Sequence, residues 1–259
     1  MTKKVLTFAD WHIGSRFGLN HPEYVSQHLK KQSDCIMLHD CFNEVRDHVG
    51  KVDYIFYLGD ICDGWNPKEH SDNRVQEEKY QVEAATKLHQ TIQGSPAVYA
   101  VHGSHYHNGD RKLDEQFAKE IKAIPEPKYG FYAPADATIK IEDTHFHIAH
   151  FITVSKSTWQ YRTTPSAREL ILAVLNDNPA RIVLRAHAHY FVYAGFHTSV
   201  GMILPGMETQ TPFMASTSPL SEPRWGAVLF TIDGDRFDWD NTKIWEPDMK
   251  AEVRKGVKG

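Results

Sequence analysis

The sequence predicts an α/β protein, because short buried strands alternate with helical segments along most of the chain. Two further observations shape that prediction. Apolar runs rich in β-branched and aromatic residues stop abruptly at aspartate or histidine, and the chain holds 16 histidines. With 259 residues, of which 41% are apolar and 24% charged, it can bury a substantial core without disulfides. We therefore expect a globular α/β protein whose strand ends carry polar side chains.

The first predicted strand lies within residues 5–14 and delivers two polar side chains at its end. Residues i and i+2 of an extended segment point to the same side, so Asp10 and His12 can converge on one cation while Trp11 faces away. Gly14 then lets the chain turn. Taken alone, such a pair is more often a capped turn and a surface imidazole, so the metal interpretation needs ligands from elsewhere in the chain.

Two later strands end in the same way. Residues 52–58 close on Gly59 and Asp60. Gly59 permits a backbone turn that leaves Asp60 projecting, and a carboxylate can bridge two cations with its two oxygens. Residues 97–101 run directly into a histidine-rich block. We interpret Asp63, three residues after Asp60, as a turn cap rather than a ligand.

Helical patterns fill the segments between the strands. Pro22 near the start and Gly50 at the end frame a long pattern, which we interpret as one helix or as two with a break near residues 33–34. The next helical segment has an apolar stripe opposite a charged face, as expected for a helix packed on a sheet. The predicted helical segments are residues 22–49, 70–93, 113–124 and 165–175.

A pair of strands is predicted at residues 138–141 and 145–150, joined across a short turn. Strand alternation puts His145 and His147 on one face and His150 on the other. We favour His150 as a ligand because it ends the strand, and we expect His145 and His147 to be structural or exposed.

The next strand, residues 181–186, terminates in His187 and His189 with one alanine between them. Two imidazoles at a strand exit are poor surface chemistry, and this pair favours metal ligation. After His189 the pattern changes to short β segments, with a hairpin marked at residues 233–234. Those segments are residues 190–194, 202–204, 226–233 and 236–239.

Charge and cysteine content narrow the class of protein. A net charge of −4 argues against a surface coated for non-specific DNA binding but leaves room for a local basic groove. The three cysteines, Cys35, Cys41 and Cys62, are odd in number and lack zinc-knuckle spacing, which fits a reducing compartment. The chain lacks a signal-peptide core and a membrane-spanning apolar run. We expect a cytoplasmic protein with no membrane partner, one domain over residues 1–247, and a loose tail over 248–259.

The order of these polar blocks along residues 3–195 resembles the calcineurin-like metallophosphoesterase family. The resemblance implies a four-layer α/β/β/α sandwich, in which two mixed β-sheets face each other with helices outside, and a two-metal site at the strand ends. The ligands that it implies for the first metal are Asp10, His12, Asp60 and His189. Asp60 would bridge to a second metal, which His150 and His187 would complete.

Two positions depart from the family pattern. The family usually has Asn where this chain has Ser104, and Asp or Glu where it has Tyr106. A serine hydroxyl is a shorter and weaker ligand than an amide oxygen, so Ser104 is expected to hold the second metal less tightly or through a water. This altered block, with residues 204–206 and 211–213, looks more like the metallophosphoesterases of phages and prophages.

The implied ligand set predicts a hydrolase with two divalent metal ions. Mixed nitrogen and oxygen ligands suit Mn²⁺, our first choice, and also Fe or Zn²⁺. Two such ions share a water, lower its pKa and clamp the phosphate, so that a metal-bridging hydroxide attacks in line. The leaving group needs a proton. His105, which matches the family's acid-bearing histidine, is the first choice for that role, and His107 is the alternative.

The substrate class is predicted from aromatic and basic side chains in loops beside the site. Such side chains can stack on bases and hold a phosphate, although each one alone is as well explained by loop packing. They favour a phosphodiester of a nucleotide or nucleic acid. The alternatives are a phosphomonoesterase acting on a nucleotide or phosphoprotein, and a non-catalytic binding module. The residues concerned are Trp65, Tyr106, Trp159, Tyr161 and Arg162.

Overall fold

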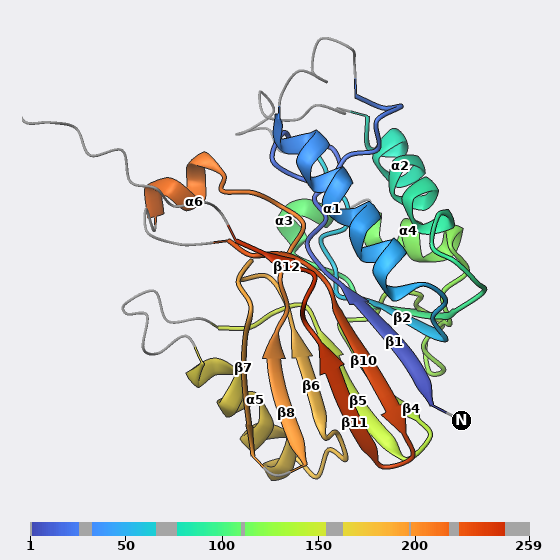
Figure 1. Cartoon of the computed structure of the whole chain (residues 1–259), viewed down its shortest axis with the longest axis vertical. Coiled ribbons are helices and arrows are strands. Elements are labelled where there is room, and N and C mark those ends of the chain that lie inside the picture. The colour runs from blue at the N-terminus through green and yellow to red at the C-terminus, as the bar shows by residue number, and fades with distance from the viewer. Residues whose placement is uncertain are drawn as a thin grey trace, which may run out of the picture.

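The fold is taken from a computed structural model of the chain, shown in Figure 1. The structure describes residues 2–25, 33–65, 77–109, 112–153, 163–196, 198–217 and 223–246. Within this part of the chain, no helix combines the length and the hydrophobicity needed to cross a lipid bilayer.

The first sheet is built on three parallel strands that begin with the N-terminal run of the sequence. They are β1 (Lys3–Phe8), β2 (Tyr54–Tyr57) and β3 (Ala97–Ala100), and they lie side by side in that order. On the other side of β1, β10 (Val228–Asp233) pairs antiparallel, and β11 (Arg236–Asp240) extends it through the hairpin that the sequence predicts. The sheet is therefore mixed, with the order β11-β10-β1-β2-β3.

The second sheet is also mixed and has five strands in the order β4-β5-β6-β8-β7. The predicted hairpin is formed by β4 (Asp136–Ile141) and β5 (Thr144–Ala149), and β6 (Ile182–Arg185) runs parallel to β5. Beyond β6 lie β8 (Ser199–Ile203), which is parallel to it, and β7 (Val192–Phe196), which is antiparallel to β8.

Alternation along the strands gives the first sheet two apolar faces. On β1, Leu6 and Phe8 belong to the core shared with the helices α1 (Ser33–Val49), α2 (Glu78–Gln90) and α4 (Leu113–Glu120). Val5 points the opposite way, into the core between the two sheets.

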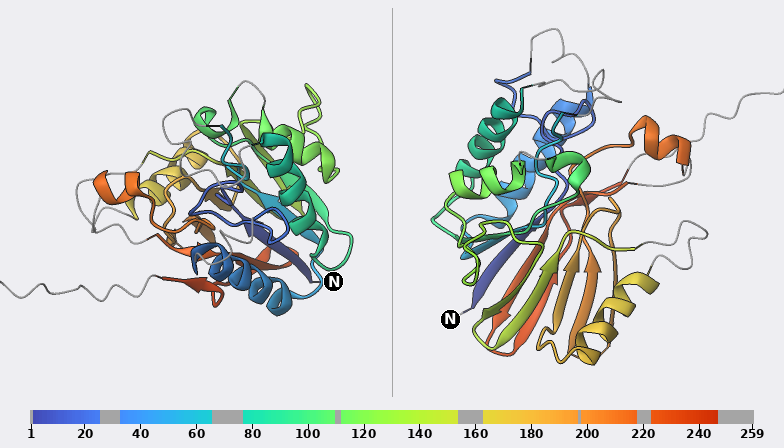
Figure 2. Two further views of the ribbon diagram at one scale, coloured as in Figure 1. Left: turned by 90° about the horizontal axis from the view of Figure 1, so that it is seen from above. Right: turned by 180° about the vertical axis from the view of Figure 1, so that it is seen from behind.

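The second sheet carries a helix on its own outer side. There α5 (Thr164–Leu175) buries Leu170 and Ala173 against Val183 of β6. Figures 1 and 2 show the resulting layers of helices, sheet, sheet and helix. The predicted four-layer α/β/β/α architecture is confirmed, and with it the fold that the resemblance implies.

The differences from the prediction are a shifted helix start and several short elements that were not predicted. The predicted helix at residues 22–49 is wrong at its start, because residues 22–25 form turns and α1 begins at Ser33. Two short helices were not predicted, α3 (His105–Asn108) and α6 (Pro212–Thr217). A small two-stranded sheet of β9 (Trp225–Gly226) and β12 (Ile244–Trp245) was not predicted either. The predicted tail at residues 248–259 lies outside the described residues.

Candidate metal centre

The polar side chains that follow four strands meet in one place, at the carboxyl ends of these strands. Side chains that follow β1, β2, β5 and β6 form clusters in which the potential ligand atoms lie within 4.8 Å of one another. One cluster contains Asp10, His12 and His189, and a second contains Asp60, His150 and His187. The structure thus brings together the six aspartates and histidines that the sequence singled out.

The Asp10–His12 segment reaches this arrangement through a backbone that differs from the predicted one. The strand ends at Phe8, and the φ angles of Asp10 and His12 are 50° and 45°, in the left-handed region. The prediction of an extended backbone is therefore wrong here. The two side chains still converge, with 3.8 Å between Asp10 Oδ1 and His12 Nε2. Trp11 is fully buried in the core between the first sheet and its helices. Backbone hydrogen bonds from Asp10 N to Gly59 O and from His12 N to Asp60 O hold this turn.

Left-handed backbone recurs across the site. Asp60, His187 and His189 have φ angles of 49°, 70° and 53°. Such angles are uncommon outside glycine, although Asp and His tolerate them better than most residues. Strained backbone of this kind persists where the surrounding structure holds it, and it is concentrated at functional sites.

Two glycines allow the ends of β2 and β3 to approach each other. A Cβ on Gly103 would lie 2.0 Å from Asp60 Oδ1, and a Cβ on Gly59 would lie 2.4 Å from Gly103 N. This contact lets Ser104 N donate to Asp60 Oδ1 at 2.7 Å. The Ser104 hydroxyl lies 3.0 Å from Asp60 Oδ2, so it donates to the carboxylate that the sequence predicts to bridge two metals.

The second cluster forms around His150, which is completely buried. Its Nδ1 is hydrogen-bonded to Leu58 O at 2.6 Å, so this nitrogen carries a proton and Nε2 faces the cluster. His150 Nε2 lies 3.1 Å from Asp60 Oδ2 and 3.2 Å from His187 Nδ1. As predicted from strand alternation, His147 lies on the other face of β5, where it pairs with Asp136 at 3.2 Å.

The first cluster holds buried polar atoms that lack hydrogen bonds. Within the described residues, Asp10 Oδ1, His12 Nε2 and His189 Nδ1 are buried and have no hydrogen-bond partner. His189 Nε2 lies 3.5 Å from Asp10 Oδ1. Unpaired buried polar atoms cost free energy, and a cation among them would offset that cost. Their mixed nitrogen and oxygen chemistry suits a transition-metal dication such as Mn²⁺, Fe²⁺ or Zn²⁺.

The electrostatics of the site favour ionised carboxylates. Burial alone would raise the pKa of Asp10, but the imidazoles of His189, His12 and His150 lower it to about 2. Burial likewise opposes ionisation of Asp60, and His150 outweighs it and lowers the pKa of that carboxyl. In turn, Asp60 raises the pKa of His150 to about 9 against the effect of burial. Asp10 and Asp60 are therefore ionised at neutral pH, the state in which a carboxylate can bind a cation.

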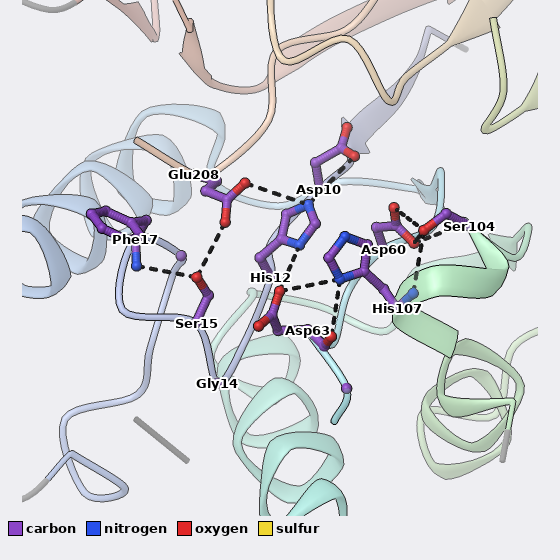
Figure 3. A network of polar contacts seen from close by, with 12 residues as sticks. Asp10, His12, Gly14, Ser15, Phe17, Asp60, Asp63, Ser104, His107 and Glu208 are labelled. Carbon is purple, nitrogen blue, oxygen red and sulfur yellow. Dashed lines mark hydrogen bonds and ion pairs between the residues drawn. The ribbon is translucent and has the colours of Figure 1, made fainter. Parts of the chain in front are cut away.

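Asp63 orients two imidazoles, a role that the sequence interpretation as a turn cap did not include. Its Oδ1 lies 3.2 Å from Nδ1 of His12 and 3.2 Å from Nδ1 of His107. A hydrogen bond between Asp63 O and His107 Nδ1 at 2.9 Å adds to the second contact. Figure 3 shows the carboxylate of Asp63 against both rings. A carboxylate on Nδ1 leaves Nε2 of His12 free to act as a ligand.

The two candidate proton donors differ in position. His107 lies in α3 with its ring 4.4 Å from the ring of His12, and its side chain clusters with His12 and Asp60. His105 begins the same helix and is exposed. Burial and His12 lower the pKa of His107, but Asp63 and Asp60 outweigh them and raise it.

The predicted substrate residues are divided between described and undescribed parts of the chain. Trp65 and Tyr106 are 48% and 51% exposed, and the Tyr106 ring lies 4.9 Å from that of His107. Trp159, Tyr161 and Arg162 lie outside the described residues. The structure adds one aromatic residue that was not predicted. Phe151 is 51% exposed, and its ring lies 5.0 Å from that of His187 and 5.1 Å from that of His150.

Glu208 is a second residue of the site that the sequence interpretation missed. It is buried, and its Oε2 lies 3.7 Å from His12 Nε2 and 3.5 Å from His189 Nδ1. The apolar run after β8 ends in this carboxylate, as the earlier runs end in theirs, but Pro205 and Gly206 interrupt the pattern. Because of that interruption, the segment was not interpreted as an apolar run that ends in a carboxylate.

Comparison with known proteins gives structural matches only. No protein-family model matches the sequence, and no curated protein does. Among solved structures, vacuolar protein sorting 29 from Cryptosporidium parvum matches with 14% identity and a TM-score of 0.46, covering 95% of this chain and 97% of its own. An archaeal phosphodiesterase matches with 12% identity and a TM-score of 0.44, covering 92% and 98%. A predicted phosphoesterase from Streptococcus pneumoniae matches with 13% identity and a TM-score of 0.40, covering 90% and 84%.

Proposed function

We propose that this protein, which has the four-layer fold described above, is a metal-dependent phosphoesterase that hydrolyses a phosphodiester of a nucleotide or nucleic acid. One observation carries the proposal. Two clusters of ligand side chains, one around Asp10, His12 and His189 and one around His150 and His187, lie on either side of Asp60. Paired sites of this kind are typical of enzymes that displace a leaving group from phosphorus.

In the proposed enzyme, the residues of the two clusters bind the cations and α3 supplies the proton. Asp10, His12 and His189 would hold one divalent cation, and His150 and His187 the other, with Asp60 shared between them. The bound pair would supply an activated water and neutralise phosphate charge. Ser104 supports the arrangement through its hydrogen bonds to Asp60. An imidazole of α3 would deliver a proton to the leaving oxygen.

Exposed aromatic rings at the edge of the site support the choice of a nucleotide substrate. Phe151 lies against the imidazoles of the second cluster, and Tyr106 lies against His107. Base–aromatic stacking contributes about 1–3 kcal/mol per base, and it suits rings that are half-exposed at a site. A phosphomonoester of a nucleotide would use the same contacts and is the second candidate. We expect the cation pair to be Mn²⁺.

The test combines metal content with hydrolysis of paired substrates. The purified protein would be stripped of metal, reloaded with Mn²⁺, Fe²⁺ or Zn²⁺, and assayed on bis(p-nitrophenyl) phosphate, p-nitrophenyl phosphate and dinucleotides. The variant Asp60→Asn removes the shared carboxylate charge. Asp53→Asn is its matched control, because Asp53 precedes β2 at the opposite end and contacts Lys3 and Lys4 N.

We expect about two bound ions per chain, faster hydrolysis of diesters than of monoesters, and loss of both properties in Asp60→Asn but not in Asp53→Asn. Faster monoester hydrolysis would replace the diesterase proposal with the second candidate. A protein that binds less than one ion and hydrolyses none of these substrates would be a binding module, and the enzyme proposal would be rejected.

A further inference from the structure

Glu208 is held in place by a backbone segment that crosses the site. Met207 N donates to Asp10 O at 2.8 Å, and Thr209 N donates to Phe17 O at 2.8 Å. Between them Glu208 forms a β-bridge with Gly18. The segment is thus tied on both sides to the loop that follows β1. Figure 3 shows the Glu208 side chain reaching from this segment toward His12 and Ser15.

The carboxylate of Glu208 lies in surroundings that offer little compensation for burial. The residue is 4% exposed, and its Oε1 accepts a hydrogen bond from the Ser15 hydroxyl at 3.2 Å. Within the described part of the chain, its ion pairs are with the imidazoles of His12 and His189 and with no lysine or arginine. A buried carboxylate is expensive unless a proton or a cation compensates it.

The imidazole of His189 lies between two carboxylates, one at each nitrogen. Nε2 lies 3.5 Å from Asp10 Oδ1, and Nδ1 lies 3.5 Å from Glu208 Oε2. Nδ1 is buried and, among the described residues, has no hydrogen-bond partner within bonding distance. A histidine that binds a metal through one nitrogen carries a proton on the other, and that proton needs an acceptor. The Glu208 carboxylate, with Oε2 3.5 Å from Nδ1, is placed to be that acceptor.

We propose that Glu208 is a positioning residue of the first cation site, where it accepts the Nδ1 proton of His189 and thereby directs Nε2 toward the cation held with Asp10. The inference rests on the metal site of the proposed function. It adds a fourth carboxylate to the site besides Asp10, Asp60 and Asp63, and it explains why a buried acid lies between two imidazoles. Its negative charge, a few ångströms from the cation, also strengthens cation binding.

The test separates the charge of Glu208 from its hydrogen bond. Glu208→Gln keeps the shape and an acceptor oxygen but loses the charge, whereas Glu208→Met loses both. Mn²⁺ affinity would be measured by titration calorimetry on metal-free protein. In Zn²⁺-loaded protein, long-range ¹H–¹⁵N NMR of the imidazoles would report which nitrogen of His189 carries the proton. Glu115→Gln is the control, because Glu115 is a buried carboxylate whose partners are Ala133 N, which donates to it at 2.7 Å, and Lys119.

We expect wild-type His189 to be protonated at Nδ1. Affinity at the first site should fall by about 10- to 100-fold in Glu208→Met and by less in Glu208→Gln. The Nδ1 proton signal should be lost in Glu208→Met, and Glu115→Gln should match the wild type. Unchanged affinity and an unchanged Nδ1 signal in Glu208→Met would overturn the inference while leaving the metal site intact. A wild-type protein that binds no cation would instead reject the proposed function itself.

Discussion

The carboxylate of Asp114 supports the backbone that presents Asp60. Its Oδ2 accepts a hydrogen bond from Asp60 N at 3.0 Å, and its Oδ1 accepts one from Ile61 N at 3.0 Å. Gly103 N and the Asn108 side-chain amide donate to Oδ2 at 2.7 and 2.8 Å. One buried acid in the first turn of α4 therefore fixes the ends of β2 and β3 at the distance that the site requires.

Asp114→Asn should destabilise the protein and weaken metal binding. Each of the two oxygens faces N–H donors, so an amide in either orientation would turn its own N–H groups toward a donor. Leaving such buried donors unsatisfied costs about 1–3 kcal/mol each, and we expect a loss of about 2–3 kcal/mol in the free energy of unfolding. Urea denaturation would measure it. The control Asp143→Asn, at a side chain that is 72% exposed, should change stability by less than about 0.5 kcal/mol.

His187→Gly should be more stable than His187→Ala in metal-free protein. His187 is exposed and has a φ of 70°, a conformation that costs a residue with a Cβ roughly 1–2 kcal/mol. Glycine avoids this cost and gives back part of it through its larger backbone entropy in the unfolded chain, so we expect an advantage of about 1 kcal/mol. Denaturation in the presence of a chelator would measure the difference.

The same pair of substitutions at Ile171 should give the opposite sign. Ile171 is 52% exposed in the middle of α5, where glycine is less favourable than alanine by about 1 kcal/mol. Equal signs at both positions would show that the left-handed backbone at His187 is not a source of strain.

The ligand residues could be predicted from the sequence, whereas two supporting carboxylates could not. Asp10, Asp60 and His187 each come two or three residues after the end of a strand, so the local pattern was enough to single them out. The sandwich follows from the order of strands and helices. Asp114 lies in a helix more than 50 residues after Asp60 in the sequence. Glu208 follows Pro205 and Gly206, which interrupt the apolar run before it. Their roles depend on hydrogen bonds and ion pairs across 53 and 196 residues of sequence, which local periodicity does not report.

The backbone conformation of the ligands was also beyond local pattern. Asp10 and His12 converge as predicted, but through left-handed residues that neighbouring loops hold in place and not through the alternation of an extended strand. The secondary-structure propensity of a residue type describes its commonest backbone conformation. A site that stores strain departs from it.

The stability of the protein should fall as the pH falls from about 6.5 to about 4, in part because of His89. Burial lowers the pKa of His89 from 6.5 to about 4, and its Nδ1 is hydrogen-bonded to the Tyr57 hydroxyl at 2.9 Å. Burial keeps the Tyr57 hydroxyl protonated by raising its pKa, so a neutral His89 accepts this bond and a protonated one does not. The stabilisation is complete above pH 6.5, where the unfolded chain is also neutral. It is lost as the unfolded state takes up the proton first.

His89→Gln isolates this contribution. A pKa that falls from 6.5 to about 4 corresponds to about 3 kcal/mol in the free energy of unfolding, which the variant would not lose on acidification. Urea denaturation at several pH values between 7.5 and 4, with chelator present throughout, would compare the two slopes. Identical slopes would show that His89 is solvated or charged in the folded state.

The assignment of the general acid can be settled by the choice of leaving group. A p-nitrophenolate leaves without a proton, whereas a sugar hydroxyl leaves only when it is protonated. The sequence predicts His105 as the donor, with His107 as the alternative. The structure favours the alternative, because His107 clusters with His12 and Asp60 while His105 is exposed.

We expect His107→Asn to lower kcat/KM for a dinucleotide by about 10²-fold or more and to change hydrolysis of the p-nitrophenyl diester far less. His105→Asn, two residues earlier on the same helix, is the matched variant and should affect both substrates equally. If only His105→Asn shows the leaving-group dependence, the first choice from the sequence is correct. If His107→Asn instead loses bound Mn²⁺ and slows both substrates alike, then the imidazole of His107 is a cation ligand, because removing a ligand lowers the rate whatever leaves, whereas removing an acid penalises only a leaving group that needs the proton.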